Sequence, residues 1–305
     1  MEKILITGGN GFIGSHLGDT LAARGNSVTL LDVNFDWHTY ESSCNKIFCD
    51  VLDYQGLKDA AKTADVIIHL AAISRVEDGE MDPIRCMSVN LDGTRNVIRV
   101  ACEGGKYLIF TSSKEVYGYL DVFPVKEESQ KIPISTYARS KFLAEQLVTD
   151  AGETRNLRYV ITRLSSVFGS LRDRNERVVP TFVRQAFSGE EITIHGGQQL
   201  MDFNFVDDVV DVLSLIVEKI HDVIGEDYNI VTGHSVTALD LAHMVKQYTG
   251  SQSSLIFQNE KEFYVHKFLA DPSKINNIIR GKTKLRPVEE GLDIYIRKVL
   301  NHKFP

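Results

Sequence analysis

A glycine-rich turn near the N-terminus constrains the fold of this chain more than any other feature of its sequence. The apolar run Lys3–Thr7 predicts a buried strand, and three glycines follow it at regular intervals, namely Gly8, Gly11 and Gly14. A strand, a glycine turn and the start of a helix form the context of a dinucleotide-binding fingerprint. The helix that opens with Phe12 and Ile13 would point its N-terminus at the phosphates. We therefore predict that these five residues bind a dinucleotide.

Strands and helices alternate through the first half of the chain. Further apolar runs predict strands at Val28–Asp32, Lys46–Cys49, Val66–Leu70, Tyr107–Thr111 and Tyr159–Arg163. Amphipathic stretches between them predict helices over about 12–24, 54–62 and 83–103. Strands that are solid apolar runs between helices indicate a parallel sheet covered on both faces. We therefore predict an α/β fold with a doubly wound parallel sheet of the Rossmann type, built from residues 1–165 plus about 204–232.

The second half of the chain is less regular. It predicts helices over 178–188 and 207–223, strands over 192–194 and 228–231, and a polar loop over 170–177. The remainder, to Pro305, is predicted to be mainly helical. No repeat or long linker separates the halves, so we expect a smaller, mainly helical C-terminal substrate domain of about 166–203 plus 233–305.

Composition excludes several classes of partner. The formal charge of −7 argues against nucleic acid, and no apolar run is long enough to cross a membrane. The N-terminal apolar run is too short for a signal peptide. The four cysteines form no C-x-x-C pair and the histidines no H-E-x-x-H motif, so we expect no metal site. Reduced thiols in a cytoplasmic protein are the expectation.

Acidic residues after two predicted strands indicate which dinucleotide is bound. Asp32 ends the second strand, where a carboxylate accepts hydrogen bonds from ribose hydroxyls and repels a 2′-phosphate. The segment from Val33 to Asp36 has no arginine or lysine for such a phosphate, so NAD is predicted rather than NADP. Asp50 and Val51 are predicted to contact the adenine, although Asp50 could equally cap the following helix.

Tyr137 and Lys141 are the strongest candidates for catalysis. Four residues apart on a helix, they lie on the same face. An ammonium beside a phenol favours the phenolate, which can take a proton from a sugar hydroxyl or return one to a carbonyl. Tyr54 and Lys58 repeat the spacing, but they begin the helix after the third strand, on the predicted adenine side. We expect that second pair to be surface or packing residues.

Ser113 completes the predicted catalytic set. It follows the fifth strand, whose end should lie near the nicotinamide, so its hydroxyl can donate a hydrogen bond to a substrate oxygen. Tyr137 would then move the proton, and Lys141 would reach the nicotinamide ribose. The cofactor supplies the hydride chemistry, and the protein supplies geometry and charge. The three residues predict oxidation and reduction at a carbinol carbon.

With these elements the chain resembles the extended short-chain dehydrogenase/reductase family, in its nucleotide-sugar epimerase/dehydratase branch. The resemblance covers nearly the whole sequence and is carried by residues 7–14, 69–72, 89–94, 113–118, 137–141, 163–169, 203–208 and 228–233. It implies cofactor contacts from small or polar residues after the fourth strand and on the next helix, namely Leu70, Ala71, Ala72 and Asn90. It also implies a nucleotide-sugar substrate and a homodimer formed by two helices per subunit. An apolar stripe is compatible with that dimer, namely Val89, Val97, Val100 and Ala101.

The substrate region resembles the family but departs from it at two positions. Arg163, Ser166 and Arg174 are the predicted substrate contacts beside Ser113. Ser166 stands where the family usually has an asparagine that helps to hold the diphosphate. Met201 stands where it usually has a diphosphate-binding arginine, which methionine cannot replace. The arginine-rich loop after Gly169 could substitute, or it could be a solvated charged surface.

The residues after Ser113 bear on the choice of reaction. A nucleotide-sugar 4-epimerase needs only Tyr137 as acid and base, and it ranks first. A 4,6-dehydratase of this branch has an Asp-Glu pair where this chain has Lys114-Glu115, so only Glu115 could act as a base. A hexuronic acid decarboxylase also uses a glutamate there, and these two activities rank second. A keto-sugar reductase ranks third. An NAD-sensing binding protein is disfavoured, because a sensor needs no tuned tyrosine.

Overall fold

The computed structural model describes residues 1–35, 42–259 and 265–302, so Asp36 of the predicted NAD-selective segment lies outside the described residues. The chain divides into two compact units. The first unit consists of residues 1–118, 129–164 and 210–228, and the second of residues 119–128, 165–209 and 229–305.

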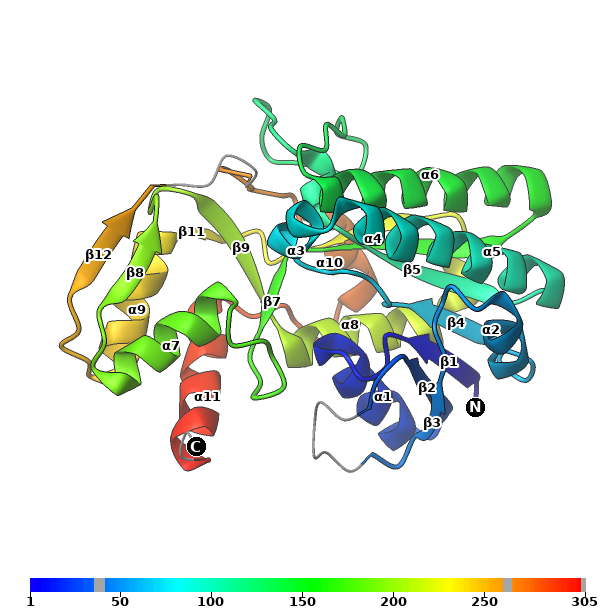
Figure 1. The fold of residues 1–305 in the computed structure, drawn as a ribbon, viewed down its shortest axis with the longest axis horizontal. Coiled ribbons are helices and arrows are strands. Elements are labelled where there is room, and N and C mark those ends of the chain that lie inside the picture. The colour runs from blue at the N-terminus through cyan, green and yellow to red at the C-terminus, as the bar shows by residue number, and fades with distance from the viewer. Residues whose placement is uncertain (36–41, 260–264, 303–305) are drawn as a thin grey trace. The chain divides into compact units, whose positions relative to one another are not determined.

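A seven-stranded sheet forms the centre of the first unit (Figure 1). Its order is β3-β2-β1-β4-β5-β6-β10. The strands are β1 (Lys3–Thr7), β2 (Ser27–Asp32), β3 (Asn45–Phe48), β4 (Val66–His69), β5 (Tyr107–Ser113), β6 (Arg158–Leu164) and β10 (Asp227–Ile230). Strands β1 to β6 pair in parallel, which confirms the predicted doubly wound fold. The order reverses between β1 and β4, where such sheets bind their ligands.

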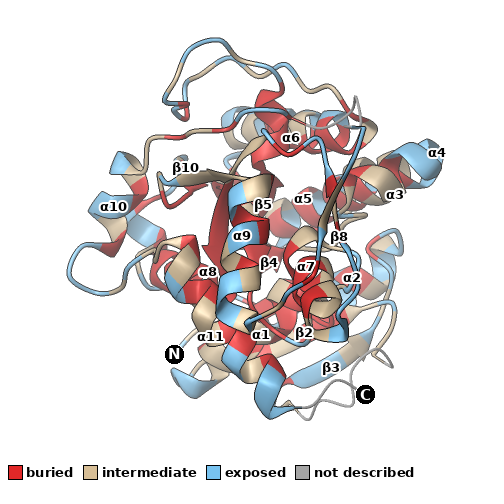
Figure 2. Cartoon of the chain, turned by 90° about the vertical axis from the view of Figure 1, so that its left-hand side faces the viewer, coloured by how far each residue is buried: buried red, intermediate tan, exposed pale blue. Residues whose placement is uncertain are grey.

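Burial explains why these strands form a central sheet. All four residues of β4, and all of β5 except Tyr107, are buried, and both strands are coloured as buried in Figure 2. Leu5 and Leu31 pack in a core cluster with apolar residues of the helices after β3, β4 and β5. Leu30 faces the other way, toward Gly18 of the first helix. The sheet is therefore covered on both faces, as solid apolar strands require.

The helices of the first unit follow the predicted order, with one difference. They are α1 (Phe12–Ala23), α2 (Tyr54–Ala60), α3 (Val76–Met81), α4 (Pro83–Met87), α5 (Gly93–Gly104) and α6 (Thr136–Arg155), with short turns η2 (Lys114–Tyr117) and η3 (Ile220–Asp222). The helix predicted over 83–103 is interrupted by the π-helical turn η1 (Ser88–Asp92), and α3 precedes it. The π turn is only five residues long, which is too short for sequence periodicity to distinguish it from α-helix.

The second unit mixes helices with two small sheets, where mainly helices were predicted. Its helices are α7 (Val178–Ser188), α9 (Ala238–Thr249), α10 (Ser273–Ile279) and α11 (Val288–Asn301). One sheet has the order β11-β9-β7 and the other pairs β12 with β8. These strands are β7 (Ser166–Phe168), β8 (Ile192–His195), β9 (Leu200–Phe205), β11 (Ser235–Thr237) and β12 (Leu255–Gln258).

Buried polar residues explain why β9 was not predicted. Asp202 and Asn204 are fully buried within it, so the strand lacks an apolar run. Asp202 accepts hydrogen bonds from the backbone N–H of Thr232 and Gly233, at 3.0 Å each, and Asn204 donates to the carbonyl of Ile230 at 2.6 Å. Two segments that carried the family resemblance, 203–208 and 228–233, are thus bound together.

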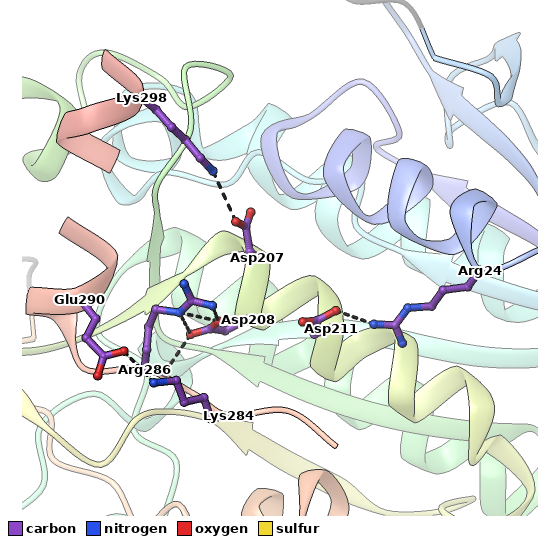
Figure 3. Close-up of polar contacts among 8 residues, drawn as sticks. All are labelled: Arg24, Asp207, Asp208, Asp211, Lys284, Arg286, Glu290 and Lys298. Carbon is purple, nitrogen blue, oxygen red and sulfur yellow. Dashed lines mark hydrogen bonds and ion pairs between the residues drawn. The ribbon is translucent and has the colours of Figure 1, made fainter. Parts of the chain in front are cut away.

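Helix α8 (Val206–Glu218) begins in the second unit and continues in the first. In the second unit, Asp208 accepts hydrogen bonds from the backbone and guanidinium of Arg286, both at 2.8 Å (Figure 3). In the first unit, Asp211 pairs with Arg24 at the end of α1. Acidic residues in the first turn also suit the positive end of the helix dipole.

The apolar stripe that seemed compatible with a dimer is covered by the chain itself. Val97, Val100 and Ala101 are buried in the core of the first unit, and Val89 packs against the same cluster. The stripe therefore gives no support to a subunit interface. Within the described residues, no helix is long and apolar enough to cross a membrane.

The environments of Asp208 and Asp211 predict unequal contributions to stability. The Asp208 side chain is 1% exposed and that of Asp211 36% exposed. Asp208→Asn should lower the free energy of unfolding by about 2 kcal/mol, because it breaks a buried pair and a backbone contact. Asp211→Asn should change it by less than about 0.5 kcal/mol. Urea denaturation of both variants measures the difference, and equal effects would contradict it.

Candidate active site

The glycine turn packs tightly and leaves one side open. A Cβ at Gly8, where φ is +72°, would lie 2.7 Å from the backbone nitrogen of Ala71, and a Cβ at Gly14 would collide with the Gly8 carbonyl oxygen. A Cβ at Gly11 would meet only that same oxygen, at 3.1 Å. Gly11 is also the N-cap of α1 and offers no side chain to the first-turn N–H groups. Open space beside uncapped N–H groups fits a pyrophosphate.

Asp32 is fixed to the glycine turn. Its Oδ2 accepts a hydrogen bond from the backbone N–H of Asn10 at 2.9 Å, and its Oδ1 accepts one from that of Asn34 at 3.3 Å. Burial raises the pKa of Asp32, and these backbone N–H groups oppose the rise. Each oxygen keeps a second lone pair, so the carboxylate fits the predicted contact with ribose hydroxyls.

Asp50 and Val51 have separate environments after β3. Asp50 accepts a hydrogen bond from the backbone N–H of Leu52 at 2.9 Å. The cap of α2 is Asp53, which accepts from Gly56 at 3.1 Å, so the alternative that Asp50 caps this helix is wrong. The side chain of Val51 is buried in the core. Their predicted contacts with adenine remain predictions.

The side chain of Asn90 forms hydrogen bonds inside the protein. Its Oδ1 accepts from the backbone N–H of Ile73 at 2.8 Å, and its Nδ2 donates to Ile73 O at 3.1 Å and to Ser140 Oγ at 2.8 Å. It lies in the π turn η1 and is 1% exposed. Asn90 therefore ties the loop after β4 to helix α6. The predicted cofactor contact can be indirect, through the loop that contains Leu70, Ala71 and Ala72.

Tyr137 lies in a first helical turn that is held at several points. Ser135 caps α6 by accepting from the backbone N–H of Ala138 at 3.1 Å. Glu80 of α3 accepts from the backbone N–H of Thr136 at 2.6 Å, and Ser140 Oγ donates to the Tyr137 carbonyl at 2.7 Å. Tyr137 itself is 8% exposed. A rigid backbone and small exposure suit a group that must meet one substrate oxygen.

Lys141 is buried on the same face of α6. It is 4% exposed, and its ammonium donates to the carbonyl of Thr111 on β5 at 2.8 Å. Burial lowers the pKa of Lys141 to about 8, although the nearby Glu145 carboxylate favours the charged form. Because little solvent screens the buried ammonium, its electrostatic interaction with a neighbouring phenol is stronger. This fits the predicted pair with Tyr137.

The second pair with this spacing lies in a different environment. Tyr54 and Lys58 both bind Glu103, at 2.6 and 2.7 Å, near the surface of α2. Arg99 stacks on the Tyr54 ring with its guanidinium carbon 3.9 Å from the centroid. The hydrogen bonds to Glu103 and Tyr54 raise the pKa of Lys58. The expectation that this pair is a surface pair is confirmed.

Ser113, Lys114 and Glu115 lie together at the carboxyl end of β5. Ser113 Oγ accepts a hydrogen bond from the backbone N–H of Glu115 at 3.2 Å, which leaves its own proton available to another acceptor. Lys114 and Glu115 are 7% and 8% exposed and form an ion pair of 3.2 Å through Oε1. Glu115 Oε2 is buried and has no hydrogen-bond partner among the described residues. A buried carboxylate oxygen without a partner is costly and characteristic of functional sites.

Arg163 is bound inside the first unit. Its guanidinium pairs with Glu145 at 2.8 Å and Asp227 at 2.8 Å, and donates to the Tyr117 hydroxyl at 3.1 Å. It is 3% exposed. These contacts give it a structural function in place of the predicted substrate contact. Glu145 was not predicted, although it follows Tyr137 and Lys141 at the next four-residue step on α6.

The other predicted substrate residues belong to the second unit. Ser166 begins β7 and lies beside Phe203 in the register of β9. Arg174 lies in the predicted loop over 170–177, with its Nε 3.9 Å from Glu176. Met201 on β9 packs against the core of this unit. The contacts of Ser166 and Arg174 with substrate remain predictions.

The glycine turn, the ribose-side carboxylate and the Tyr137–Lys141 face define the class of protein. They lie on a doubly wound sheet and make an NAD-dependent oxidoreductase-type site, in which the turn and Asp32 would hold the cofactor. Among the described residues, no group of three or more His, Cys, Asp or Glu side chains could hold a metal ion.

Comparison with known proteins identifies the family. Residues 4–231 match the model of the NAD dependent epimerase/dehydratase family. The chain belongs to this family, and the predicted family, NAD cofactor and enzymatic nature are confirmed. It is 31% identical to the UDP-N-acetyl-alpha-D-glucosaminuronate decarboxylase of Bacillus cytotoxicus, over 92% of this chain and 91% of the relative.

Solved structures of the same fold include two epimerases. UDP-glucose 4-epimerase from Thermotoga maritima, in a structure with UDP-glucose, is 27% identical with a TM-score of 0.91, and covers 98% of this chain and 99% of its own. UDP-glucuronic acid 4-epimerase from Bacillus cereus, in a complex with UDP-glucuronic acid and NAD, is 25% identical with a TM-score of 0.89 and the same coverage.

The two tyrosine–lysine pairs predict opposite shifts of the lysine pKa, downward for Lys141 and upward for Lys58. Lys141 should lose its proton near pH 8, because burial disfavours the ammonium, whereas the pKa of Lys58 should lie above its ordinary value. Carbon-13 NMR of lysines labelled at Cε, assigned with Lys141→Arg and Lys58→Arg, measures both. A Lys141 signal that titrates together with those of surface lysines would contradict the prediction.

The contacts of Arg163 predict a loss of stability when Glu145 is changed. Glu145→Gln should lower the free energy of unfolding by about 3 kcal/mol, because it leaves a buried guanidinium partly uncompensated. Glu153→Gln, on the exposed side of the same helix, is the matched control and should cost less than about 0.5 kcal/mol. Chemical denaturation compares them. A stable Glu145→Gln protein would restore Arg163 as a candidate for substrate binding.

Proposed function

We propose that this enzyme decarboxylates a nucleotide-linked hexuronic acid through a transient 4-keto sugar. The observation that carries the proposal is the buried Lys114–Glu115 pair directly after Ser113, with Glu115 Oε2 lacking a partner. A plain 4-epimerase needs no second carboxylate beside its serine and tyrosine. The Bacillus cytotoxicus relative acts on a sugar acid by name, and the Bacillus cereus structure contains one. The predicted order of activities is therefore reversed, with decarboxylation first.

Ser113, Tyr137 and Lys141 perform the oxidation and reduction at C4. The bound NAD would supply the acceptor and donor for the hydride of C4. Tyr137 takes the proton of the 4-hydroxyl as the ketone forms, while Ser113 donates a hydrogen bond to the same oxygen. The Lys141 ammonium stabilises the phenolate form of Tyr137 that this step needs. Burial of Lys141 strengthens the interaction.

Glu115 and Lys114 act at the neighbouring carbon. With a ketone at C4, the C5–C6 bond breaks and its electron pair passes into the carbonyl, which gives CO2 and an enolate. C5 then gains one proton, and Tyr137 returns its proton to O4 as the ketone is reduced. We assign the C5 proton to the Lys114–Glu115 pair, in which the ammonium is the proton store and Glu115 Oε2 the transfer atom. The sum is one hexuronate and one proton converted to a pentose and CO2.

A 4-epimerase is the second candidate. It is favoured by the likeness to two epimerase structures that span nearly the whole chain. It would use the same Ser113, Tyr137 and Lys141, with hydride returned to the other face of the ketone. No observation in the described structure specifically favours dehydration, simple ketone reduction or NAD sensing.

The nucleotide, the subunit state and the location are further proposals. Met201 packs against the core of the second unit and supplies no charge to a diphosphate. We propose Arg174 and its neighbours Arg172 and Arg177 as the cations that replace the missing arginine, with Ser166 as a neutral contact. A homodimer in the cytoplasm stays the expectation from the family, and all four cysteines are free thiols.

A substrate panel tests the proposal and separates the two candidates. The enzyme with NAD is incubated with UDP-, GDP-, dTDP- and CDP-linked hexuronic acids and hexoses, and products are followed by NMR and CO2 release. CO2 together with a nucleotide pentose supports decarboxylation. A new epimer without CO2 overturns it in favour of the epimerase. If no sugar reacts, the binding-protein alternative gains.

Variants of the two acid–base groups sharpen the result. Glu115→Gln should lower decarboxylation by about 100-fold or more, because an amide cannot pass a proton from Lys114 to C5, and should leave oxidation at C4 possible. Tyr137→Phe should abolish every activity, whereas Tyr54→Phe, its matched control on α2, should be as active as the parent. Steady-state rates on the accepted substrate measure all three. Full decarboxylation by Glu115→Gln would remove the assigned role of the pair.

A further inference from the structure

We propose that His69 is a positioning residue of the cofactor site, a neutral imidazole with its proton on Nε2. In this form it joins the strand before the glycine turn to the π turn of Asn90 through one directed chain of hydrogen bonds. His69 is the last residue of β4 and has no exposed surface. In the sequence it begins the segment 69–72, and nothing in the proposed reaction uses it.

The ring of His69 lies between two buried threonines. Its Nδ1 is 2.6 Å from Thr7 Oγ1, and its Nε2 is 3.0 Å from Thr94 Oγ1. Thr7, the last residue of β1, is 0% exposed, and Thr94 on α5 is 1% exposed. Neither nitrogen of the ring can therefore bind solvent, and both hydroxyls have to share protons with it.

The contact at Thr94 fixes which atoms donate and which accept along this series of hydrogen bonds. Thr94 Oγ1 lies 2.6 Å from the carbonyl of Asn90, which can only accept, so the Thr94 hydroxyl donates there and accepts from His69 Nε2–H. At the other end, the backbone N–H of Ala71 can only donate, and it points to Thr7 Oγ1 at 3.4 Å. With the ring proton on Nε2, Nδ1 of a neutral ring is an acceptor, so Thr7 gives its own proton to Nδ1 while its oxygen accepts from Ala71. The reverse tautomer would set the Nε2 lone pair against Thr94 Oγ1, whose proton is already donated to Asn90.

The electrostatic surroundings agree with a neutral ring. Burial lowers the pKa of His69 to about 3, and the Lys141 ammonium adds to the effect. The aromatic ring of Phe110 lies 5.9 Å away, and the described structure places no carboxylate in hydrogen-bonding contact with the imidazole. An imidazolium would carry a second N–H toward Thr7 Oγ1 and would turn the Thr7 hydroxyl proton away from the ring.

This series of hydrogen bonds connects parts of the site whose relative positions have to be kept. Thr7 precedes Gly8, which packs against the backbone of Ala71. At the other end, the side chain of Asn90 holds Ile73 and Ser140, and Ser140 donates to the Tyr137 carbonyl. His69 therefore sets the distance between the cofactor turn and the turn that supports the catalytic helix. This function does not depend on which sugar is the substrate.

NMR of the histidine-labelled enzyme tests the tautomer directly. With nitrogen-15 in the rings, two-bond couplings to the ring protons show which nitrogen is protonated, and His69→Gln assigns the signal. We expect an Nε2–H signal that does not titrate between about pH 5 and pH 8. An Nδ1–H signal, or titration of His69 in this range, would overturn the proposal.

Threonine variants on both sides of His69 test the positioning function through NAD affinity. Thr7→Val and Thr94→Val remove one hydroxyl each with little change of shape, and each should weaken NAD binding roughly tenfold. Thr94→Ser keeps the hydroxyl and should recover most of the affinity. In a His69→Leu background, both valine changes should have little further effect, because the chain is already broken.

Calorimetric titration with NAD, together with urea denaturation, separates positioning from mere stabilisation. Valine variants that lose stability but keep the parent NAD affinity would overturn the proposal. So would valine effects on affinity that persist unchanged in the His69→Leu background. Because no sugar substrate enters the measurement, its failure is distinguishable from failure of the proposed decarboxylation.

Discussion

The close packing of the glycine turn against the loop after β4 is the constraint on which the rest of the site depends. Gly8 can approach Ala71 because it has no Cβ and accepts a positive φ. That approach brings together the carboxyl ends of β1 and β4, where the order of the sheet reverses. It also aims the uncapped N-terminus of α1 along the same edge. The cofactor site therefore follows from a contact between two backbone segments.

Burial of charge is the second organising feature, and it separates chemistry from structure. Lys141, Lys114 and Glu115 are all nearly inaccessible to solvent at the ends of β5 and α6, where electrostatic interactions are strong. Arg163 is equally buried, but its guanidinium is fully engaged by protein groups. The difference lies in the partners. Glu115 keeps an oxygen without one, and that oxygen is what an acid–base group requires.

Much of the fold could be predicted, because its signals are local. Strands such as β4 are short apolar runs, the glycine spacing identifies the cofactor turn, and α7 begins and ends where its periodicity does. The missed elements lack such signals. β9 carries buried Asp202 and Asn204, whose partners come from a distant segment, and the π turn η1 is too short, at five residues, to show in the periodicity.

The sequence by itself determined the family and the NAD cofactor, and it predicted the Tyr137–Lys141 pair, because each depends on spacing along one strand–turn–helix unit or one helix. Only the tertiary structure showed how that pair and Tyr54–Lys58 differ in burial and neighbours, since Lys141 is buried whereas Tyr54 and Lys58 bind Glu103 near the surface. It also turned Arg163 from a substrate contact into an internal ion pair. Burial and pairing arise between segments far apart in the chain, so no local pattern encodes them.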